Sequence, residues 1–162
     1  MSQDLLLTIE GGVATITLNR PDRLNAFTAE MTEELADIVH ELEHNDDVRA
    51  VLFRGEGRAF SAGGDVKSFH EKLLVDQQRY ARSMESTVVS GHLAFHRLRR
   101  MPKPVIVAAH GVTAGLGVSL VCCADLVIAA DDSEFMLAYR HIGLSLDGGV
   151  SYFLPRIIGE RR

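Results

Sequence analysis

The chain has 162 residues, carries 17 Lys+Arg against 22 Asp+Glu for a formal net charge of −5, and is 46% hydrophobic. This composition excludes a disordered segment, a collagen-like chain and a small disulfide-stapled protein, and the length suits one domain over residues 1–162. The mildly acidic balance argues against nucleic-acid binding through bulk charge, although a few local donors can still hold an anionic small ligand.

Hydrophobic periodicity in the first hundred residues predicts a hairpin, two helices and a buried strand. The expected segments are strands at 5–9 and 13–18, a helix from Thr28 to about 44, a strand within 49–54 and a long helix over about 77–99. Thr28 is a good N-cap because its hydroxyl can accept a bond from a first-turn amide. His92 falls along the apolar stripe of the long helix, which ends before Pro102.

The second half of the chain continues the alternation of strands and helices. The expected segments are a strand at 105–109, a helix at 117–124, strands at 125–130 and near 134–137, and a helical start near 150–158. Glycine-rich turns follow buried strands at 55–65 and at 110–117, and each opens a helix. This order of strand, turn and helix predicts an α/β fold.

The two glycine-rich turns are the first candidates for a functional site. Backbone N–H groups at a helix N-terminus lack partners within the helix and lie at the positive end of its dipole. Two such ends that converge on one carbonyl oxygen would stabilise an oxyanion or an enolate. Tight turns without any ligand need the same glycines, so the spacing leaves both interpretations open.

The two cysteines and the N-terminus indicate a cytoplasmic chain. Cys122 and Cys123 are adjacent in an apolar stretch, and neighbouring cysteines rarely reach each other with relaxed disulfide geometry. We therefore expect buried free thiols in a reducing compartment. The N-terminus lacks the basic and apolar regions of a signal peptide, and the longest apolar run, at about 118–124, is too short to span a bilayer. No membrane contact is expected.

Motifs for dinucleotide, nucleotide or nucleophile chemistry are incomplete. Phe60 stands where a fingerprint that begins at Gly55-x-Gly57 needs a third glycine, and the sequence has no Gly-Lys-Ser/Thr P-loop. Ser145 lies in a near match to a nucleophile elbow, but the motif ends in Asp147 instead of glycine. We therefore expect no nucleotide cofactor.

Two histidine pairs have the spacing of metal ligands on a helix. His40 and His44 are four residues apart, as are His92 and His96. Neither pair has an obvious third ligand nearby in the sequence. Surface or core-edge histidines explain both pairs, so we predict no metal.

Four stretches of the chain form a recognisable series. They are Asn19–Ala26, Arg58–Asp65, Pro104–Gly117 leading to Asp125, and Gly143–Gly149 with Tyr152–Arg156. Together they resemble the crotonase superfamily, the enoyl-CoA hydratase/isomerase family, and they cover nearly the whole chain in family order. The resemblance implies a spiral of ββα units with helices packed around it, an acyl-CoA substrate of fatty acid metabolism with no separate cofactor, and a homo-oligomer, a trimer or hexamer. Family members continue past Gly159 with more helices, so we expect that this C-terminal helical region is absent.

The resemblance also implies site residues. The amides of Gly64 and Leu116 would hold the thioester oxygen and stabilise an enolate-like anion, although the family commonly has glycine at the second position. Contacts to CoA carry over to Arg23, Leu24, Ala26, Ala62, Gly64, Asp65, Val66 and Lys67. Arg23 and Lys67 suit phosphate groups by charge, and solvated surface cations are the alternative.

Three positions decide which reaction the resemblance favours. Hydratases, which are lyases, use two glutamates, but Ser119 and Tyr139 stand at the matching positions and neither can act as a carboxylate base. Tyr139 is instead expected to contact the substrate. Asp147 matches a carboxylate of isomerase-type members and could carry a proton between two carbons; a turn Asp that caps the next helix is the alternative. Enoyl-CoA isomerisation is therefore favoured over hydration.

Two further functions stay open. Some family members that dehalogenate aryl-CoA thioesters pair a nucleophilic Asp with a helix His, and Asp147 and His92 match that pair, with Tyr139 near the aryl position. A non-catalytic acyl-CoA-binding subunit would also explain the missing glutamates.

Overall fold

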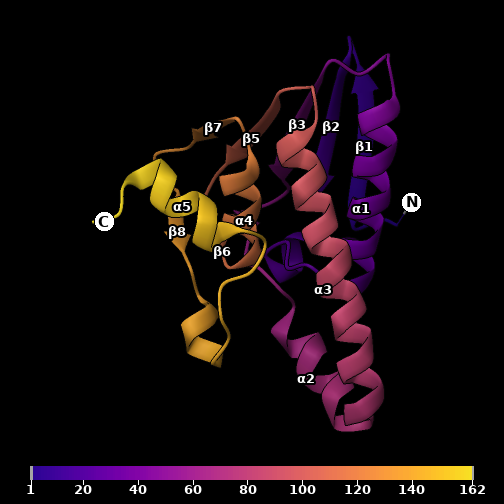
Figure 1. The fold of residues 1–162 in the computed structure, drawn as a ribbon, viewed down its shortest axis with the longest axis vertical. Helices are drawn as coiled ribbons and strands as arrows, with labels where there is room; N and C mark the ends of the chain where they lie inside the picture. The colour runs from indigo at the N-terminus through magenta and orange to yellow at the C-terminus, as the bar shows by residue number, and fades with distance from the viewer. Residues whose placement is uncertain (1, 162) are drawn as a thin grey trace.

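The computed structural model describes residues 2–161 and contains two sheets (Figure 1). The first has five strands in the order β1 (Leu5–Glu10), β2 (Val13–Leu18), β3 (Ala50–Gly55), β5 (Val105–Ala109) and β7 (Leu126–Ala129). The second has three short strands in the order β4 (Ala59–Ser61), β6 (Val112–Ala114) and β8 (Glu134–Met136). The helices are α1 (Ala29–His44), α2 (Val66–Val75), α3 (Gln77–Arg100), α4 (Leu116–Cys123) and α5 (Val150–Ile158), with 3-10 turns at Pro21–Arg23 and Tyr139–Ile142.

The first sheet begins with the predicted hairpin. β1 and β2 pair antiparallel with Leu5 opposite Leu18, and Gly11 and Gly12 supply the positive φ angles of the turn between them. The remaining pairs in this sheet are parallel, since helices connect their strands. Inward-facing residues such as Phe53 are fully buried and form the core.

Helices α1 and α3 pack together beside the first sheet (Figure 1). Thr28 caps α1 as predicted, because its hydroxyl oxygen accepts a bond of 3.1 Å from the Met31 amide. The apolar stripe of α1 is buried at Met31, Leu35, Ile38, Val39 and Leu42. A Cβ added to Gly91 of α3 would lie 3.1 Å from Thr32 Cγ2, so the glycine permits the close approach of the two helices.

Of the second sheet, the sequence predicted only the strand β8. Periodicity gave turns at 55–65 and 110–117, but β4 and β6 lie within them, and three residues are too few to show a strand pattern. These two strands pair in parallel, with Ser61 beside Thr113. The segments that follow them therefore leave the sheet side by side.

Most other expected elements are confirmed within one or two residues. His92 lies on the same face of α3 as Met84, Val88 and Phe95, as predicted, but its side chain is exposed, whereas the buried residues of the helix include Ala94, Phe95 and Leu98. Cys122 and Cys123 are buried free thiols, as predicted. Among the helices of residues 2–161, none combines the length and the hydropathy that a bilayer crossing needs.

Candidate active site

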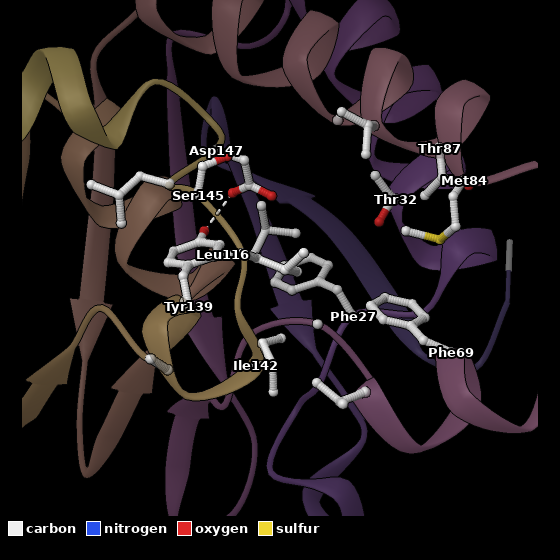
Figure 2. A pocket seen from close by; sticks show the side chains of 18 of the residues that line it. Phe27, Thr32, Phe69, Met84, Thr87, Leu116, Tyr139, Ile142, Ser145 and Asp147 are labelled. Carbon is white, nitrogen blue, oxygen red and sulfur yellow. Dashed lines mark hydrogen bonds between the residues drawn. The ribbon is translucent and has the colours of Figure 1, made fainter. Parts of the chain in front are cut away.

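A cavity of about 540 Å³ lies between α1, α3, the two glycine-rich segments and residues 138–147 (Figure 2). Most of its lining is apolar, from Phe27, Phe69, Met84, Val88, Phe95, Leu116, Ile142, Leu144 and Leu146. In the view of Figure 2, Asp147 and Tyr139 lie at one end, Thr32 and Thr87 at the other, and Leu116 between them. Both threonine hydroxyls donate to helix carbonyls, so the second end presents no free hydroxyl proton.

The two glycine-rich segments meet at the wall of this cavity. Gly63 has a φ of +91°, and a Cβ added there would lie 2.9 Å from the Ala114 carbonyl oxygen and 3.3 Å from the Leu116 amide nitrogen. Only glycine allows this approach of the two backbones. Gly64 and Leu116 both line the cavity, and within residues 2–161 neither amide donates a hydrogen bond to the protein. Both N–H groups are available to a ligand.

Asp147 is held by a chain of hydroxyl groups. The Tyr139 hydroxyl donates to Asp147 Oδ1, and Ser119 Oγ lies 3.1 Å from the Tyr139 oxygen and 3.1 Å from the Asp147 carbonyl oxygen. Ser119 and Tyr139 are buried. Burial first, and the bond to Asp147 second, raise the pKa of the Tyr139 hydroxyl well above its ordinary value. The phenol therefore stays protonated and donates throughout the neutral range.

The backbone after Asp147 packs tightly against α3 and α4. Gly148 has a φ of +56°, and its added Cβ would lie 2.6 Å from Ser119 Cβ and 2.9 Å from the Phe95 ring. The Gly148 amide donates to His92 Nε2 at 3.2 Å, so this nitrogen is the acceptor and the neutral ring carries its proton on Nδ1. The interpretation of Asp147 as a helix cap is wrong, because Gly149 is the N-cap of α5 and that end has no side-chain cap.

The loop before α1 is joined to the first glycine-rich segment by a buried amide and an ion pair. Asn25 is fully buried and donates to the Glu56 and Ala59 carbonyls at 2.9 and 2.8 Å. Asp65 accepts from the Ser68 amide at 3.1 Å and pairs with Arg20 at 3.1 Å. Burial acts to raise the pKa of Asp65, but these two bonds outweigh it and hold the pKa below its usual value.

The structure brings together most of the predicted site residues. Those that line the cavity are Ala62, Gly64, Val66, His92, Leu116, Tyr139 and Asp147. Those outside its lining are Arg23, Leu24, Ala26, Asp65 and Lys67. Arg23 and Lys67 are exposed, and Lys67 Nζ lies 4.0 Å from Glu71. Their contact with CoA stays a prediction.

Comparison with known proteins decides the family. The chain matches the Enoyl-CoA hydratase/isomerase family over residues 8–162. It belongs to that family. The resemblance stated from the four sequence stretches is therefore confirmed, and so is the crotonase-like α/β fold.

Curated relatives and solved structures agree on this family. The chain is 39% identical over 163 residues to 1,2-epoxyphenylacetyl-CoA isomerase of Escherichia coli (strain K12), covering 100% of this chain and 61% of the relative. It is 37% identical over 153 residues to 4-chlorobenzoyl coenzyme A dehalogenase-2 of Arthrobacter sp., covering 93% and 54%. An enoyl-CoA hydratase crystal structure from Mycobacterium avium subsp. paratuberculosis K-10 superposes with a TM-score of 0.86 at 29% identity, covering 98% and 60%. The chain thus spans between about half and three fifths of these relatives.

Sequence reasoning missed the contacts that organise the crotonase-family site. It named Ser119, Tyr139 and Asp147 one by one, but their hydrogen bonds join residues 8 to 28 positions apart. Arg20 was not named, although it pairs with Asp65 across 45 positions. The nearest sequence indication was that Arg20 falls inside the first stretch that resembles the family.

Proposed function

We propose that this chain carries the catalytic core of an acyl-CoA enzyme that stabilises a thioester enolate, with enoyl-CoA isomerisation favoured over hydration. The observation that carries the proposal is the Asp147 carboxylate in an apolar cavity that two unpaired amides also line. Two relatives are named 1,2-epoxyphenylacetyl-CoA isomerase and trans-2-decenoyl-[acyl-carrier-protein] isomerase, and these names support an isomerase reaction.

The first step is binding of the thioester oxygen. The N–H groups of Gly64 and Leu116 would donate to the carbonyl oxygen, and their bonds strengthen as negative charge develops on it. A bound acyl chain would displace water from the apolar lining, so each bond would then act at a lower effective dielectric than in solution. This polarisation acidifies the protons on the carbon next to the carbonyl.

The second step is proton transfer by Asp147. Its carboxylate removes a proton from the carbon beside the thioester carbonyl, and the electron pair moves toward the bound oxygen to form an enolate conjugated with the double bond. Asp147 returns the same proton to the far carbon of that conjugated system. The double bond has then migrated toward the thioester, and no atom is gained or lost.

The hydroxyl chain gives Asp147 one reactive oxygen. Tyr139 holds Oδ1, while Oδ2 accepts no hydrogen bond from the described residues. Tyr139 and Ser119 thus act as positioning residues at the two places where hydratases have glutamates. Because neither is a carboxylate, a second base for activating water is missing, and isomerisation is favoured.

The remaining predicted residues are proposed to contact CoA outside the cavity. Arg23 and Lys67 would approach its phosphates, since the exposed 4.0 Å pair of Lys67 with Glu71 is weak enough to rearrange. The backbone of Leu24 lies beside the cavity wall, because its carbonyl accepts from the Ala62 amide at 2.8 Å.

The test of this function is Asp147→Asn with a 3-enoyl-CoA as substrate. We expect turnover to fall by about 10²–10⁴-fold, because the amide cannot take the proton, while CoA binding measured by calorimetry persists. Asp131→Asn, a matched change at an exposed position, should leave both quantities unchanged. Equal turnover in the wild-type and Asp147→Asn proteins would place the chemistry elsewhere.

A second candidate is dehalogenation of an aryl-CoA, since Asp147 and His92 line the same cavity. Asp147 would attack the ring carbon and expel halide, and His92 would activate water to cleave the aryl ester. His92 Nε2 already accepts from the Gly148 amide, which leaves this nitrogen occupied and disfavours the candidate. Chloride release from 4-chlorobenzoyl-CoA without turnover of 3-enoyl-CoA would favour dehalogenation.

A non-catalytic acyl-CoA-binding subunit is the remaining alternative. Acyl-CoA binding without turnover of any substrate would favour it.

A further inference from the structure

The C-terminal end of α1 carries a cluster of metal-ligating side chains. His40, Glu43 and His44 each offer one ligand atom, and these atoms all lie within 4.8 Å of one another. Glu43 and His44 lie three and four residues after His40, so both are its neighbours on the surface of α1. Glu43 thus supplies the third ligand that the sequence did not indicate. We propose that this α1 histidine cluster, His40, Glu43 and His44, binds a divalent transition-metal ion of the Zn²⁺ class.

The ring of His44 keeps one nitrogen available to a metal ion. Its Nδ1 lies 2.9 Å from the His40 carbonyl oxygen. A carbonyl can only accept, so Nδ1 carries the proton and the lone pair of the neutral ring is on Nε2. A histidine that ligates a metal typically donates its other ring N–H to such a carbonyl, which fixes the tautomer.

Arg97 of α3 shows that the other two ligands converge on one positive charge. Its Nη1 lies 2.7 Å from His40 Nδ1 and 2.6 Å from Glu43 Oε2. A guanidinium only donates, so His40 Nδ1 presents its lone pair to this point. A metal ion would take the place of the guanidinium between the same two atoms. Imidazole nitrogen and carboxylate oxygen are ligands that Zn²⁺ accepts.

The surroundings of the cluster favour a cation. His40 and Arg97 line a second cavity of about 340 Å³, into which Glu33 and Asp37 of α1 also face. These carboxylates, together with the exposed Glu41, add negative potential around the cluster. His40 and His44 are exposed, so water completes the coordination shell. No described residue lines both this second cavity and the cavity that Asp147 and Leu116 line. The proposed metal site is therefore independent of the proposed function.

The experiment is calorimetric titration of the 162-residue chain with Zn²⁺. We expect one ion per chain, and His40→Ala and His44→Ala should each weaken binding by about tenfold or more. His96→Ala, which removes another exposed helix histidine, is the matched control and should not change it. Cys122 and Cys123 do not compete, because burial keeps their thiols protonated. Circular dichroism checks that each variant folds.

A second variant tests the role of Arg97. Arg97→Met keeps much of the side-chain length but removes the competing charge, so Zn²⁺ affinity should rise several-fold. Weaker Zn²⁺ binding in this variant would contradict the proposed competition between the ion and the guanidinium of Arg97. The site itself is overturned if millimolar Zn²⁺ shows no saturable binding, or if His44→Ala binds Zn²⁺ as the wild-type chain does.

Discussion

At the scale of single residues, Tyr139 holds the Asp147 carboxylate in one orientation within the cavity. It is buried, which keeps its hydroxyl protonated, and it donates to one oxygen of Asp147 while Ser119 contacts it from behind. A donor that does not ionise in the neutral range holds the carboxylate in one orientation. The cavity can then present the other oxygen to a substrate.

Removing the Tyr139 hydroxyl should therefore separate positioning from binding. We expect Tyr139→Phe to lower kcat by about 10- to 100-fold through misplacement of the base, with KM changed by less than about twofold. Loss of the hydrogen bond should also cost about 1 kcal/mol of unfolding free energy. Steady-state kinetics and urea unfolding measure the two effects. The exposed Tyr152 supplies the control, Tyr152→Phe, and an unchanged kcat in Tyr139→Phe would reduce its role to stability.

At the scale of elements, the loop from Gly143 to Gly149 positions Asp147 through backbone contacts. Gly148 and Gly149 have positive φ angles of +56° and +80°, and the chain between the 3-10 turn at Tyr139–Ile142 and α5 passes close to both α3 and α4. The Gly148 carbonyl accepts a weak bond from the Cys123 thiol at 3.7 Å. Side chains larger than hydrogen at Gly148 have no space.

The substitution Gly148→Ala tests this loop. Its methyl group would overlap Ser119 and Phe95 and would strain the left-handed backbone, so we expect about 2–3 kcal/mol of destabilisation and loss of most turnover. Gly143→Ala is the matched control, since Gly143 also has a positive φ of +69° but no atom lies within 4 Å of the added Cβ. It should show only the backbone strain of about 1 kcal/mol and near-normal turnover. Equal stability losses in urea unfolding would contradict the packing argument.

Helix α4 carries two buried thiols that make its packing sensitive to alkali. Burial raises the pKa of Cys122 from 9.0 to about 11 and the pKa of Cys123 to about 12. As pH rises, the thiols of the unfolded chain lose their protons first, so the stability that these groups contribute is full below pH 9 and declines above it. The urea midpoint should therefore fall as the pH rises from about 9 toward about 11. The double variant Cys122→Ala/Cys123→Ala should show a flatter profile, and an equally steep one would assign the effect to other groups.

At the scale of the whole molecule, the site is assembled from three separate parts of the chain. The parallel pair of β4 and β6 sets Gly63 close to Ala114 and Leu116, and packing of Val150 in α5 against Val118 and Cys122 in α4 brings up the loop that holds Asp147. Side chains of β7 and β8, including Leu126, Ile128 and Phe135, are exposed on this single chain. The trimer or hexamer expected from the resemblance stays a prediction that sedimentation can check.

The sequence predicted the site residues that lie within recognisable family motifs. Gly64, Leu116 and Asp147 lie in stretches that resemble the family, and all three line the cavity. Periodicity placed His92 along the apolar stripe of α3, but it could not show that the exposed side chain lines the cavity, because a residue at the edge of such a stripe can face either the core or a cavity. The Asp147 cap was wrong because Gly149 is the N-cap of α5 and no side chain caps that end.

The sequence by itself determined the elements whose causes are local. The hairpin around Gly11-Gly12, the Thr28 cap and the apolar stripe of α1 depend on residues a few positions apart, so spacing alone predicts them. Only the tertiary structure decided the second sheet, the hydroxyl chain on Asp147 and the contact of Arg97 with the α1 histidine cluster. Those contacts join residues from 8 to 57 positions apart. The packing of the whole chain brings these residues into contact, so no pattern of neighbouring residues can predict the pairs.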